Sequence, residues 1–598
     1  MRFPSFALIT AVLVVGCSSA PPSTPVIDTF AADLRQPEGP SGISTQPGWR
    51  GRKFAIASAH PLASAAGLAM LQAGGAAVDA AVAAQMVLTL VEPQSSGIGG
   101  GALLLHYDGR DTVAFDGRET APAAVGETLF SKPDGQPMRF HEAVVGGRAV
   151  GVPGTVRLLE MAHAEYGKLP WASLFEPAIR LAEDGFAVGQ RLHTLLQADP
   201  YLRKDPQAAA YFYGRDGQAA AIGSTLRNPE LAEVLRRIAR DGSRALHEGE
   251  IAQAVVDKVQ GHPENPGQLS LGDMATYQPR RRTPFCHRHT PRAVVPPRSY
   301  VICGFPPPAS GAIAIAQILG ILEHTEAPAL AFSDPLWMHY YGEASRLAFA
   351  DRAQYVADPD FVAAPGGDWQ ALIHPAYLAE RARLIGPRSM RLASPGMPSA
   401  QVTSHAPMPE QAEHGTSHLS VVDVYGNALA LTTSIEDAFG ARQMVRGFLL
   451  NNELSDFSFT ARDERGTPIA NRVEPGKRPR SSMSPTLVFD AQTGELVMSG
   501  GSPGGALIIH YTAKLLYATS YWGLGPQQAI DLPNFGSLNG PTLLEEKRFT
   551  ASFIAALQAR GHEVREIPMN SGLQAILKNA GGFAGGADPR REGRVMGE

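Results

Sequence analysis

Two apolar runs around a short polar turn constrain the fold of this chain more than any other feature of its sequence. Residues 420–422 (Ser-Val-Val) and 428–431 (Ala-Leu-Ala-Leu) flank a turn at residues 423–427 (Asp-Val-Tyr-Gly-Asn), a pattern that predicts a β-hairpin. If the three central turn residues form a loop whose glycine is left-handed, the aspartate pairs with the asparagine. Counted outward in that register, Thr416 lies opposite Ser434.

Gly415 immediately precedes this pair of hydroxyls. Because glycine has no Cβ, its peptide can be held in a strained conformation that a neighbouring hydroxyl can attack. Thr416 is β-branched, so few side-chain rotamers compete with an attacking one. Threonine and serine are nevertheless common in strands, and the pair alone would not define a site. The pattern predicts a nucleophile only when further motifs support it.

Composition and charge point away from nucleic acid as a partner. The chain has 598 residues, of which 44% are hydrophobic and 18% charged, with a formal net charge of −5. That length can bury a large core, in several domains or in one layered unit. The small net charge gives no reason to expect nucleic-acid binding. The densest basic stretch, residues 280–298, lacks interleaved aromatic residues, so a solvated surface is the simpler interpretation.

The N-terminus has the form of an export signal. Arg2 precedes an apolar run at residues 6–15, which is too short to span a membrane and is typical of a signal-peptide core. Gly-Cys-Ser at residues 16–18 resembles the lipobox of bacterial lipoproteins, in which the cysteine is lipidated and becomes the new N-terminus. We therefore predict a lipoprotein signal peptide at residues 1–17, with Cys17 lipidated. A plain cleaved signal with an incidental cysteine is the alternative.

The same resemblance implies a location. It indicates an exported, periplasmic protein that is lipid-anchored to a membrane, and Ser18, in place of aspartate, favours the outer membrane. Residues 18–50 are rich in Pro, Ser, Thr and Gly and are predicted to form a flexible tether. The folded part is expected to begin with a short strand at residues 54–57.

The two remaining cysteines, Cys286 and Cys303, are available for a disulfide because export removes the reducing environment of the cytosol. Short apolar runs lie beside them, which favours a bridge between neighbouring strands. A metal site that adds His287 and His289 is a sharper alternative, but the spacing matches no closed zinc site well.

Helix and strand signals predict a layered architecture. Pro61 begins a helix that ends at the glycine pair 74–75, and residues 76–90 form a second helix of small apolar residues. From about residue 416 strands predominate, and helices return near the C-terminus. Further helices are expected within 155–260, 310–390 (for example 336–352), 506–519 and 547–560, and strands at 448–450, 486–489 and 496–498. This order predicts sheets between helical layers.

Ordered motifs along most of the chain resemble those of the γ-glutamyltransferase family. The resemblance covers roughly residues 51–590. The matching motifs are 91–101 (Val-Glu-Pro-Gln-Ser-Ser-Gly-Ile-Gly-Gly-Gly), 116–119 (Asp-Gly-Arg-Glu), 306–311 (Pro-Pro-Pro-Ala-Ser-Gly), 349–352 (Phe-Ala-Asp-Arg), 414–423 (His-Gly-Thr-Ser-His-Leu-Ser-Val-Val-Asp), 434–440 (Ser-Ile-Glu-Asp-Ala-Phe-Gly), 451–457 (Asn-Asn-Glu-Leu-Ser-Asp-Phe), 477–486 (Lys-Arg-Pro-Arg-Ser-Ser-Met-Ser-Pro-Thr) and 501–505 (Gly-Ser-Pro-Gly-Gly).

The resemblance implies a fold and a processing event. The expected fold class is α/β (α+β), an αββα sandwich of the N-terminal nucleophile hydrolase type. The precursor is expected to cut itself between Gly415 and Thr416. The products would be a large subunit, residues 51–415, and a small catalytic subunit, residues 416–598, which form a heterodimer.

Thr416 and Ser434 are the catalytic hydroxyls that the resemblance implies. The freed α-amine of Thr416, with a reference pKa of ~7.7–8.0, can act as base for its own hydroxyl. No histidine need serve as base, so His414 and His418 are expected to be structural or to aid processing. No metal and no organic cofactor is expected, because an amine and backbone dipoles suffice for this chemistry.

A γ-glutamyl substrate would need a cation for its α-carboxylate. A planar, bidentate guanidinium suits that task, and Arg118 matches the family's arginine at this position. Ser481 and Ser482 match the hydroxyls that add hydrogen bonds to the same carboxylate. These three residues form the expected carboxylate-binding part of the site.

The substrate's α-ammonium and the developing oxyanion need the opposite partners. Glu436, Glu453 and Asp456 match the family's acidic clamp for the ammonium. The backbone N–H groups of Gly504 and Gly505 match its oxyanion hole, a device worth roughly 2.7–4 kcal/mol per donor.

Four departures from the family pattern concern specificity. Many members carry Asn at the position of Glu436, Thr at that of Ser434, and some carry Gln at that of Glu453. A clamp of three carboxylates should raise the demand for a cationic substrate end. Residues 458–474, which correspond to the active-site lid, are short and contain no tyrosine. We hypothesise a more open site that tolerates larger donors or acceptors.

Three functions follow from these patterns. The first is a γ-glutamyltransferase and glutathione hydrolase, with glutathione, other γ-glutamyl compounds and amino acid or peptide acceptors as small-molecule partners. The second keeps the mechanism for a glutaryl or cephalosporin side chain, although a glutaryl group has no ammonium for the acidic clamp. The third is an uncut binding lipoprotein with an inactive site, which no motif supports.

Overall fold

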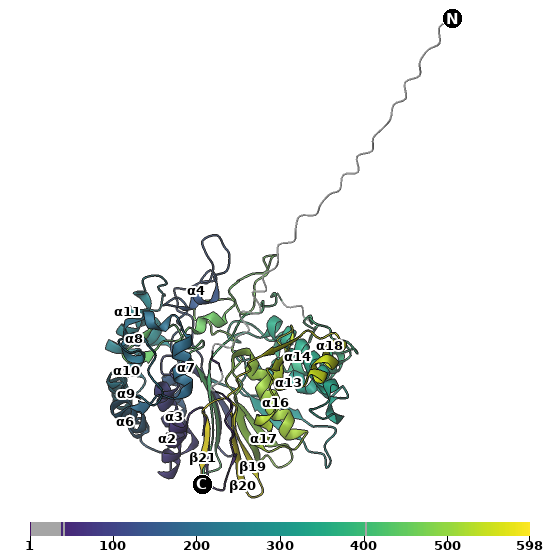
Figure 1. Ribbon diagram of the computed structural model, residues 1–598, viewed down its shortest axis with the longest axis horizontal. Helices are drawn as coiled ribbons and strands as arrows, with labels where there is room; N and C mark the ends of the chain where they lie inside the picture. Colours follow the sequence, from purple (N-terminus) through teal and green to yellow (C-terminus); the bar gives the residue numbers. More distant parts are fainter. Residues whose placement is uncertain (2–37, 40–41, 401–403) are drawn as a thin grey trace. The chain divides into compact units, whose positions relative to one another are not determined.

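Two seven-stranded β-sheets lie face to face between two layers of helices (Figure 1). The computed structural model describes residue 1, residues 38–39, residues 42–400 and residues 404–598. The predicted signal peptide and Cys17 lie outside the described residues. The four-layer αββα arrangement is the fold that the sequence predicts.

One sheet is antiparallel throughout and contains the hairpin. Its strands, in spatial order, are β21 (Arg594–Gly597), β2 (Ala55–Ser58), β10 (Ser417–Val422), β11 (Ala428–Ser434), β3 (Gly101–Tyr107), β4 (Thr112–Gly117) and β7 (Arg280–Arg282). The backbone N–H of Asp423 donates to the carbonyl of Asn427 at 3.1 Å, which closes the hairpin turn in the predicted register. In this sheet β10 and β11, which follow residue 416, lie between β2 and β3, which precede it.

The second sheet is also antiparallel. Its order is β1 (Trp49–Gly51), β20 (Gly582–Ala587), β19 (Gln574–Asn579), β15 (Leu496–Gly501), β14 (Thr486–Asp490), β9 (Tyr300–Gly304) and β8 (Phe285–His289). β14 and β15 lie at the positions predicted for strands, whereas the glycine-rich β20 was not predicted.

The alternating side chains of the hairpin explain its place in the middle of the fold. Leu419 and Leu431 face the helical layer and join its core. Ala428 and Ala430 face the other sheet and pack with residues such as Leu487 of β14. Because successive strand residues point to opposite faces, both faces of the hairpin are buried. Small residues between the sheets permit their close approach.

The first helical layer packs on the sheet that contains the hairpin. Every residue of α3 (Ala77–Val91) is buried, as its small apolar side chains predict, and α3 contacts both hairpin strands. The layer contains α2 (Pro61–Gln72), α5 (Thr155–Tyr166), α6 (Glu176–Asp184), α7 (Gln190–Ala198), α8 (Pro206–Phe212), α9 (Pro229–Asp241), α10 (Arg244–His247), α11 (Gly249–Gln260) and α12 (Leu271–Thr276).

The second helical layer covers the other sheet, on the right in Figure 1. It contains α13 (Gly311–Leu322), α14 (Pro335–Tyr355), α15 (Pro375–Ala382), α16 (Ile508–Ser520), α17 (Pro526–Asp531) and α18 (Ala551–Ala559), with a small sheet of β16 (Phe535–Gly536), β17 (Thr542–Glu545) and β18 (Val564–Ile567). Within the part of the chain that is described, no helix combines the length and hydropathy that a membrane span requires.

The predicted tether, residues 18–50, extends too far toward the C-terminus. Trp49 and Arg50 belong to β1, which pairs with β20 at the edge of a sheet. Ser44 donates a backbone hydrogen bond of 2.8 Å to Pro589, and Glu38 is only 2% exposed. The prediction of a tether up to residue 50 was wrong because a local composition rich in Pro, Ser and Gly does not show that residues pair with a distant C-terminal segment.

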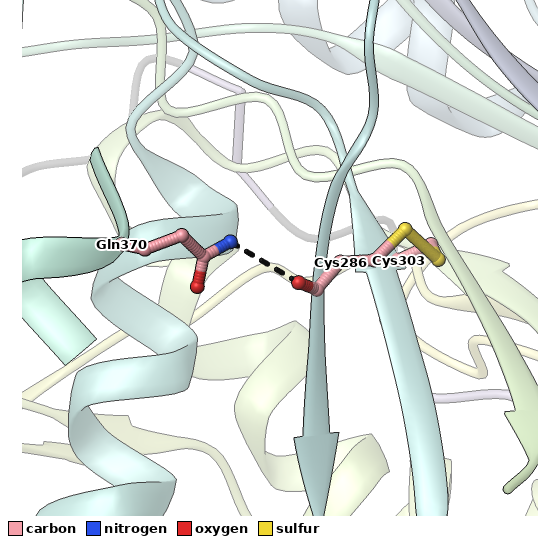
Figure 2. Close-up of a disulfide and its surroundings, with 3 residues drawn as sticks. All are labelled: Cys286, Cys303 and Gln370. Carbon is pink, nitrogen blue, oxygen red and sulfur yellow. Dashed lines mark hydrogen bonds between the residues drawn. A yellow bond between two sulfur atoms is a disulfide. The ribbon is translucent and has the colours of Figure 1, made fainter. Parts of the chain in front are cut away.

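Cys286 and Cys303 form a disulfide between β8 and β9 (Figure 2). The two cysteines are direct partners in the β8–β9 register, and Gln370 donates a side-chain hydrogen bond of 3.2 Å to the Cys286 carbonyl. The alternative metal site therefore loses its two thiolates. His289, one of the two histidines of that alternative site, is instead hydrogen-bonded to Tyr521 at 2.9 Å.

Candidate active site

Thr416 and Ser434 lie at the open end of the hairpin. Ser417 pairs with Thr433, and the same register sets Thr416 opposite Ser434, as predicted. The two residues are 2% and 3% exposed. The hairpin therefore brings two buried hydroxyls together.

Both hydroxyls bond to one oxygen atom. Thr416 Oγ1 donates to the carbonyl oxygen of Gly415, and Ser434 Oγ donates to the same oxygen at 2.8 Å. The backbone N–H of Glu436 donates to Ser434 Oγ at 2.7 Å, which fixes the direction in which the serine hydroxyl points. The geometry singles out the Gly415–Thr416 peptide.

The site leaves no room for a side chain at position 415. A Cβ built at this position would overlap Oε1 of Glu38 and would lie 2.7 Å from the carbonyl oxygen of Glu436. Gly415 is not among the described glycines with positive φ. The expectation of a strained glycine is therefore not met through a left-handed backbone; close approach of neighbouring groups explains the residue.

Arg118 is held at the end of β4, with an exposed fraction of 1%. Its Nε donates to Pro479 at 3.2 Å and its Nη2 to Arg480 at 3.0 Å, both through carbonyl oxygens. It also forms ion pairs with Glu453 and Asp456. In the uncut chain Arg118 is therefore paired with two carboxylates of the predicted acidic clamp. A zwitterionic head group would complement this arrangement, because each of its charges finds an opposite charge.

Glu436, the third predicted clamp carboxylate, contacts the residues just before the Gly415–Thr416 bond. Its Oε1 accepts a hydrogen bond of 3.0 Å from the backbone of His414, and its Oε2 accepts from Asn452 and from Ser455. Burial, together with neighbouring carboxylates, raises the pKa of Glu436 above its ordinary value. The residue has a φ of 75°, a conformation that is costly for a non-glycine residue and is found mainly at functional sites.

The segment upstream of the bond reaches a predicted substrate-binding serine. Ser482 donates to Glu413, and Arg352 donates to Ser482 Oγ and to Glu413 Oε1, each at 2.6 Å. Arg480 lies 3.7 Å from the same carboxylate. Sequence reasoning assigned no role to Arg352 or Glu413. Arg352 lay within a matched motif, whereas no local signal marked Glu413.

Ser481 is buried beside Ser482, but its hydroxyl has a local partner. Its Oγ accepts a hydrogen bond of 3.1 Å from the backbone of Met483. The Ser481 carbonyl accepts from both the backbone and the hydroxyl of Ser310. In the uncut chain Ser481 therefore braces the loop, and Ser482 is the serine in contact with a carboxylate.

Gly504 and Gly505 open the helical turn that leads into α16. Their φ angles are 131° and 56°, which favour glycine at both positions. A Cβ on Gly505 would overlap the carbonyl oxygen of Glu413. Of the two predicted oxyanion residues, Gly505 thus approaches Glu413, two residues before Gly415.

The predicted lid, residues 458–474, forms an ordered loop next to the clamp. Asn471 accepts a backbone hydrogen bond from Ser458 and donates 2.7 Å from its side chain to the Asp456 carbonyl. Phe459 stacks on Phe130 with ring centroids 4.5 Å apart. Aromatic packing thus anchors the start of the loop.

The two histidines around the bond have structural contacts. His418 is buried between Thr432 and Ser420, which its ring nitrogens contact at 2.8 and 3.1 Å. Burial lowers the pKa of His418 to about 3, so its ring is neutral. The His414 ring packs against Phe140 with centroids 4.8 Å apart. These contacts agree with the structural role expected for His418.

One group of possible metal ligands exists among the described residues: His339, Glu343 and His562. His339 and His562 are hydrogen-bonded to each other at 2.8 Å. Glu343 accepts a hydrogen bond of 2.8 Å from Arg346. A positively charged neighbour and filled hydrogen bonds disfavour a cation. The group is best described as a hydrogen-bonded network.

The layered αββα fold is that of the N-terminal nucleophile hydrolases, and in this chain a threonine hydroxyl lies beside its own preceding peptide. Among solved structures, a cephalosporin acylase from Bacillus halodurans is similar, with a TM-score of 0.79 and 26% identity over 96% of this chain and 98% of that chain. The γ-glutamyltranspeptidase of Helicobacter pylori is 30% identical, with a TM-score of 0.53 over 61% of this chain and 98% of the other.

Sequence comparison identifies the family. The family model described as Gamma-glutamyltranspeptidase matches residues 63–598, so the chain belongs to the γ-glutamyltranspeptidase family. It is 34% identical to a glutathione hydrolase proenzyme of Bacillus subtilis (strain 168), over 92% of each chain. It is 33% identical to that of Escherichia coli (strain K12), over 97% of each chain. An acylase ACY 1 proenzyme from Pseudomonas sp. (strain V22) is also 33% identical, over 95% of each chain.

Proposed function

We propose that this protein is a self-processing γ-glutamyltransferase with Thr416 as its nucleophile. It cleaves the γ-glutamyl amide bond of glutathione and related compounds and passes the group to water or to the amine of an amino acid or peptide. The observation that carries the proposal is the convergence of the Thr416 and Ser434 hydroxyls on the carbonyl of Gly415.

Self-cleavage begins with attack of Thr416 Oγ1 on the carbonyl carbon of Gly415. The C–N bond then breaks, and the hydroxyl proton is transferred to the Thr416 nitrogen, which leaves an ester between the two residues. Water adds to this ester and returns the hydroxyl to Thr416, with Gly415 as a new carboxyl terminus. Ser434 supports the step because its hydrogen bond of 2.8 Å ends on the oxygen that becomes negative.

The mature reaction repeats this chemistry on a substrate. The α-amine of Thr416 accepts the hydroxyl proton while Oγ1 attacks the γ-carbonyl carbon of the donor. The amide nitrogen leaves with a proton, and a γ-glutamyl ester remains on Thr416. Water or an acceptor amine then attacks that ester and regenerates the hydroxyl. The N–H groups of Gly504 and Gly505 are proposed to hold the oxyanion.

The clamp supplies the substrate preference. Arg118 and Ser482 would bind the α-carboxylate, with Ser481 beside them, and Glu436, Glu453 and Asp456 would bind the α-ammonium. Ser482 already holds the Glu413 carboxylate in the uncut chain, which supports its affinity for such a group. Departure of residues 411–415 after cleavage would free these positions.

A gel of the purified protein tests this proposal. Two fragments are expected, and N-terminal sequencing of the smaller one should give Thr-Ser-His-Leu-Ser. A single intact chain that does not hydrolyse a γ-glutamyl anilide would overturn the enzyme assignment.

An acylase of the same mechanism is the second candidate, because the chain is 33% identical to an acylase ACY 1 proenzyme. A glutaryl side chain carries a carboxylate but no ammonium, so it would offer the three clamp carboxylates no cationic group to bind. Parallel rates on γ-glutamyl and glutaryl anilides separate the two functions. Faster turnover of the glutaryl compound would support the acylase.

The N-terminal signal carries the proposed location. Lipidation of Cys17 would anchor the protein to a periplasmic membrane face, with the outer membrane favoured by Ser18. Fractionation of cells that produce the full chain and a Cys17→Ser variant tests this. The full chain should be found with membranes, and the variant should not.

A further inference from the structure

A carboxylate from outside the matched motifs lies over the candidate cleavage site. Glu38 is 2% exposed, and its Oε1 occupies the space that a Cβ on Gly415 would need. That oxygen has no hydrogen-bond partner among the described residues. Since the Cα of Gly415 is two bonds from the nitrogen of Thr416, this unused acceptor lies near the place where cleavage would create an amine.

The other Glu38 oxygen is fixed by two arginines. Oε2 forms ion pairs with Arg191 of α7 and, at 3.0 Å, with Arg591. The backbone carbonyl of Glu38 accepts from the side chain of Asn570 at 2.5 Å. Glu38 is therefore anchored by residues from both sides of the predicted cut, although residues 18–50 were expected to form a tether.

The same charge cluster continues to the nucleophile. Arg591 donates to the carbonyl oxygen of Thr416 at 3.1 Å. Ser417 donates to Glu92 at 3.1 Å, and Glu92 lies 3.5 Å from Arg191. Glu38 thus contacts Gly415 directly and reaches Thr416 through Arg591.

The cluster around Glu38 contains charges of both signs. Glu38 pairs with Arg191 and Arg591, and the carboxylate of Glu92 belongs to the same cluster. Asp588 acts on Arg591 and Glu592 acts on Glu92, while the Glu436 carboxylate accepts from the backbone of His414. Burial raises the pKa of Glu92 to about 7, so this carboxylate is only partly charged at neutral pH. A new ammonium beside two guanidinium groups would be costly without a counter-ion.

We propose that Glu38 is a positioning residue that fixes the Gly415–Thr416 peptide for self-cleavage and afterwards pairs with the α-ammonium of Thr416. The inference rests on the proposed function, in which Thr416 becomes the N-terminal base. Before the cut, Glu38 holds Arg591 on the Thr416 carbonyl. After the cut, its Oε1 accepts from the ammonium and raises the pKa of that group.

The experiment compares the full chain with its Glu38→Gln and Glu38→Asp variants. Self-cleavage is followed on gels over time, and kcat of the cut proteins is measured against pH with a γ-glutamyl anilide. Glu598→Gln removes a charge from an exposed pair with Lys53 and is the matched control.

Glu38→Gln should slow self-cleavage by about tenfold or more, because misplacement of reacting groups carries penalties of that order. Without its counter-ion the amine loses its proton more readily. The acid limb of the kcat profile should therefore move to lower pH by about one unit. Glu38→Asp keeps the charge but withdraws it by one methylene, so its limb should move in the same direction by less. The control should match the parent in both measurements.

Cleavage at the parental rate together with an unmoved acid limb in Glu38→Gln would overturn the proposal. If Glu38→Gln does not fold, the pH profile of Glu38→Asp decides in the same way. A parental chain that never cuts itself would instead refute the proposed function, so the two failures are distinguishable.

Discussion

The hydroxyl of Ser434 donates a hydrogen bond of 2.8 Å to the carbonyl oxygen of Gly415. That oxygen would carry the negative charge when Thr416 attacks. Ser434 lies on the strand next to Thr416, so the hairpin register alone sets this relationship. If the proposed self-cleavage takes place, this contact links the strand pairing to its rate.

Ser434→Ala removes this donor and should slow self-cleavage about 10²–10³-fold, the usual effect of losing one oxyanion donor. Ser434→Thr keeps a hydroxyl in the same strand and should cut at close to the parental rate. Gel densitometry over time gives both rates. Equal rates for the alanine and parental chains would remove Ser434 from the mechanism.

Thr416→Ala should give a single uncut chain without activity, because it removes the hydroxyl that is proposed to attack the Gly415 carbonyl carbon. Thr416→Ser retains the nucleophile but loses the methyl that restricts its rotamers, so it should cut more slowly. Mass spectrometry of the products checks the outcome. A cut before residue 416 in the alanine variant would contradict the assignment.

Glu436→Gln should reduce the preference for γ-glutamyl over glutaryl anilides. Loss of one charged hydrogen bond to the substrate ammonium costs about 1.5–3 kcal/mol, which corresponds to roughly 10–100-fold in kcat/KM for the γ-glutamyl compound alone. Glu464→Gln removes an exposed lid carboxylate and is the control. An unchanged ratio of the two kcat/KM values would exclude Glu436 from ammonium binding.

The raised pKa of Glu436 predicts a pH dependence of stability in the uncut chain. In the folded chain this carboxyl keeps its proton at pH values above its ordinary pKa of about 4.3. Its contribution to the free energy of unfolding is therefore fully present below that pH. The contribution is lost as the pH rises through the folded pKa. In a Thr416→Ala background, melting temperature should fall toward high pH, and Glu436→Gln should make that fall shallower. Parallel melting curves for both proteins would refute this prediction.

The disulfide should stabilise the protein without taking part in the reaction. Its cysteines are 17 residues apart, and closing a loop of about that length contributes roughly 3 kcal/mol in the chain-entropy account. A Cys286→Ser/Cys303→Ser double variant should melt a few degrees lower and keep its kcat. A reductant should lower the melting temperature of the parent but not that of the variant. Thiol titration of the parent supplies the control, and two free thiols in the absence of reductant would contradict the bridge.

Local patterns predicted the centre of the fold well. The hairpin register followed from its turn residues and α3 from its run of small apolar residues, because both signals lie within a short stretch of sequence. β20 was missed because its glycines lack the β-branched side chains that mark a strand. β1 was missed because its partner lies more than 500 residues away along the chain.

The site was predictable where motifs carried it. Arg118, Glu453 and Asp456 were expected to lie together, and they do. Their mutual ion pairs in the uncut chain were not expected, because a motif gives residue types and not the state of the precursor. Glu413 and Glu38 had no local signal in the sequence, since each is held in the site by ion pairs with arginines that are distant in sequence.

The strand order of the hairpin sheet has a further consequence. β2 and β3 precede the proposed cut, while β10, β11 and β21 follow it, and the two sets are interleaved by hydrogen bonds. Hydrolysis of one peptide bond would leave every one of these ladders intact. The two products could then separate only if the central sheet came apart, so dilution at moderate temperature should not inactivate the cut protein. Because unfolding of the cut protein releases two chains, its melting temperature should rise with protein concentration.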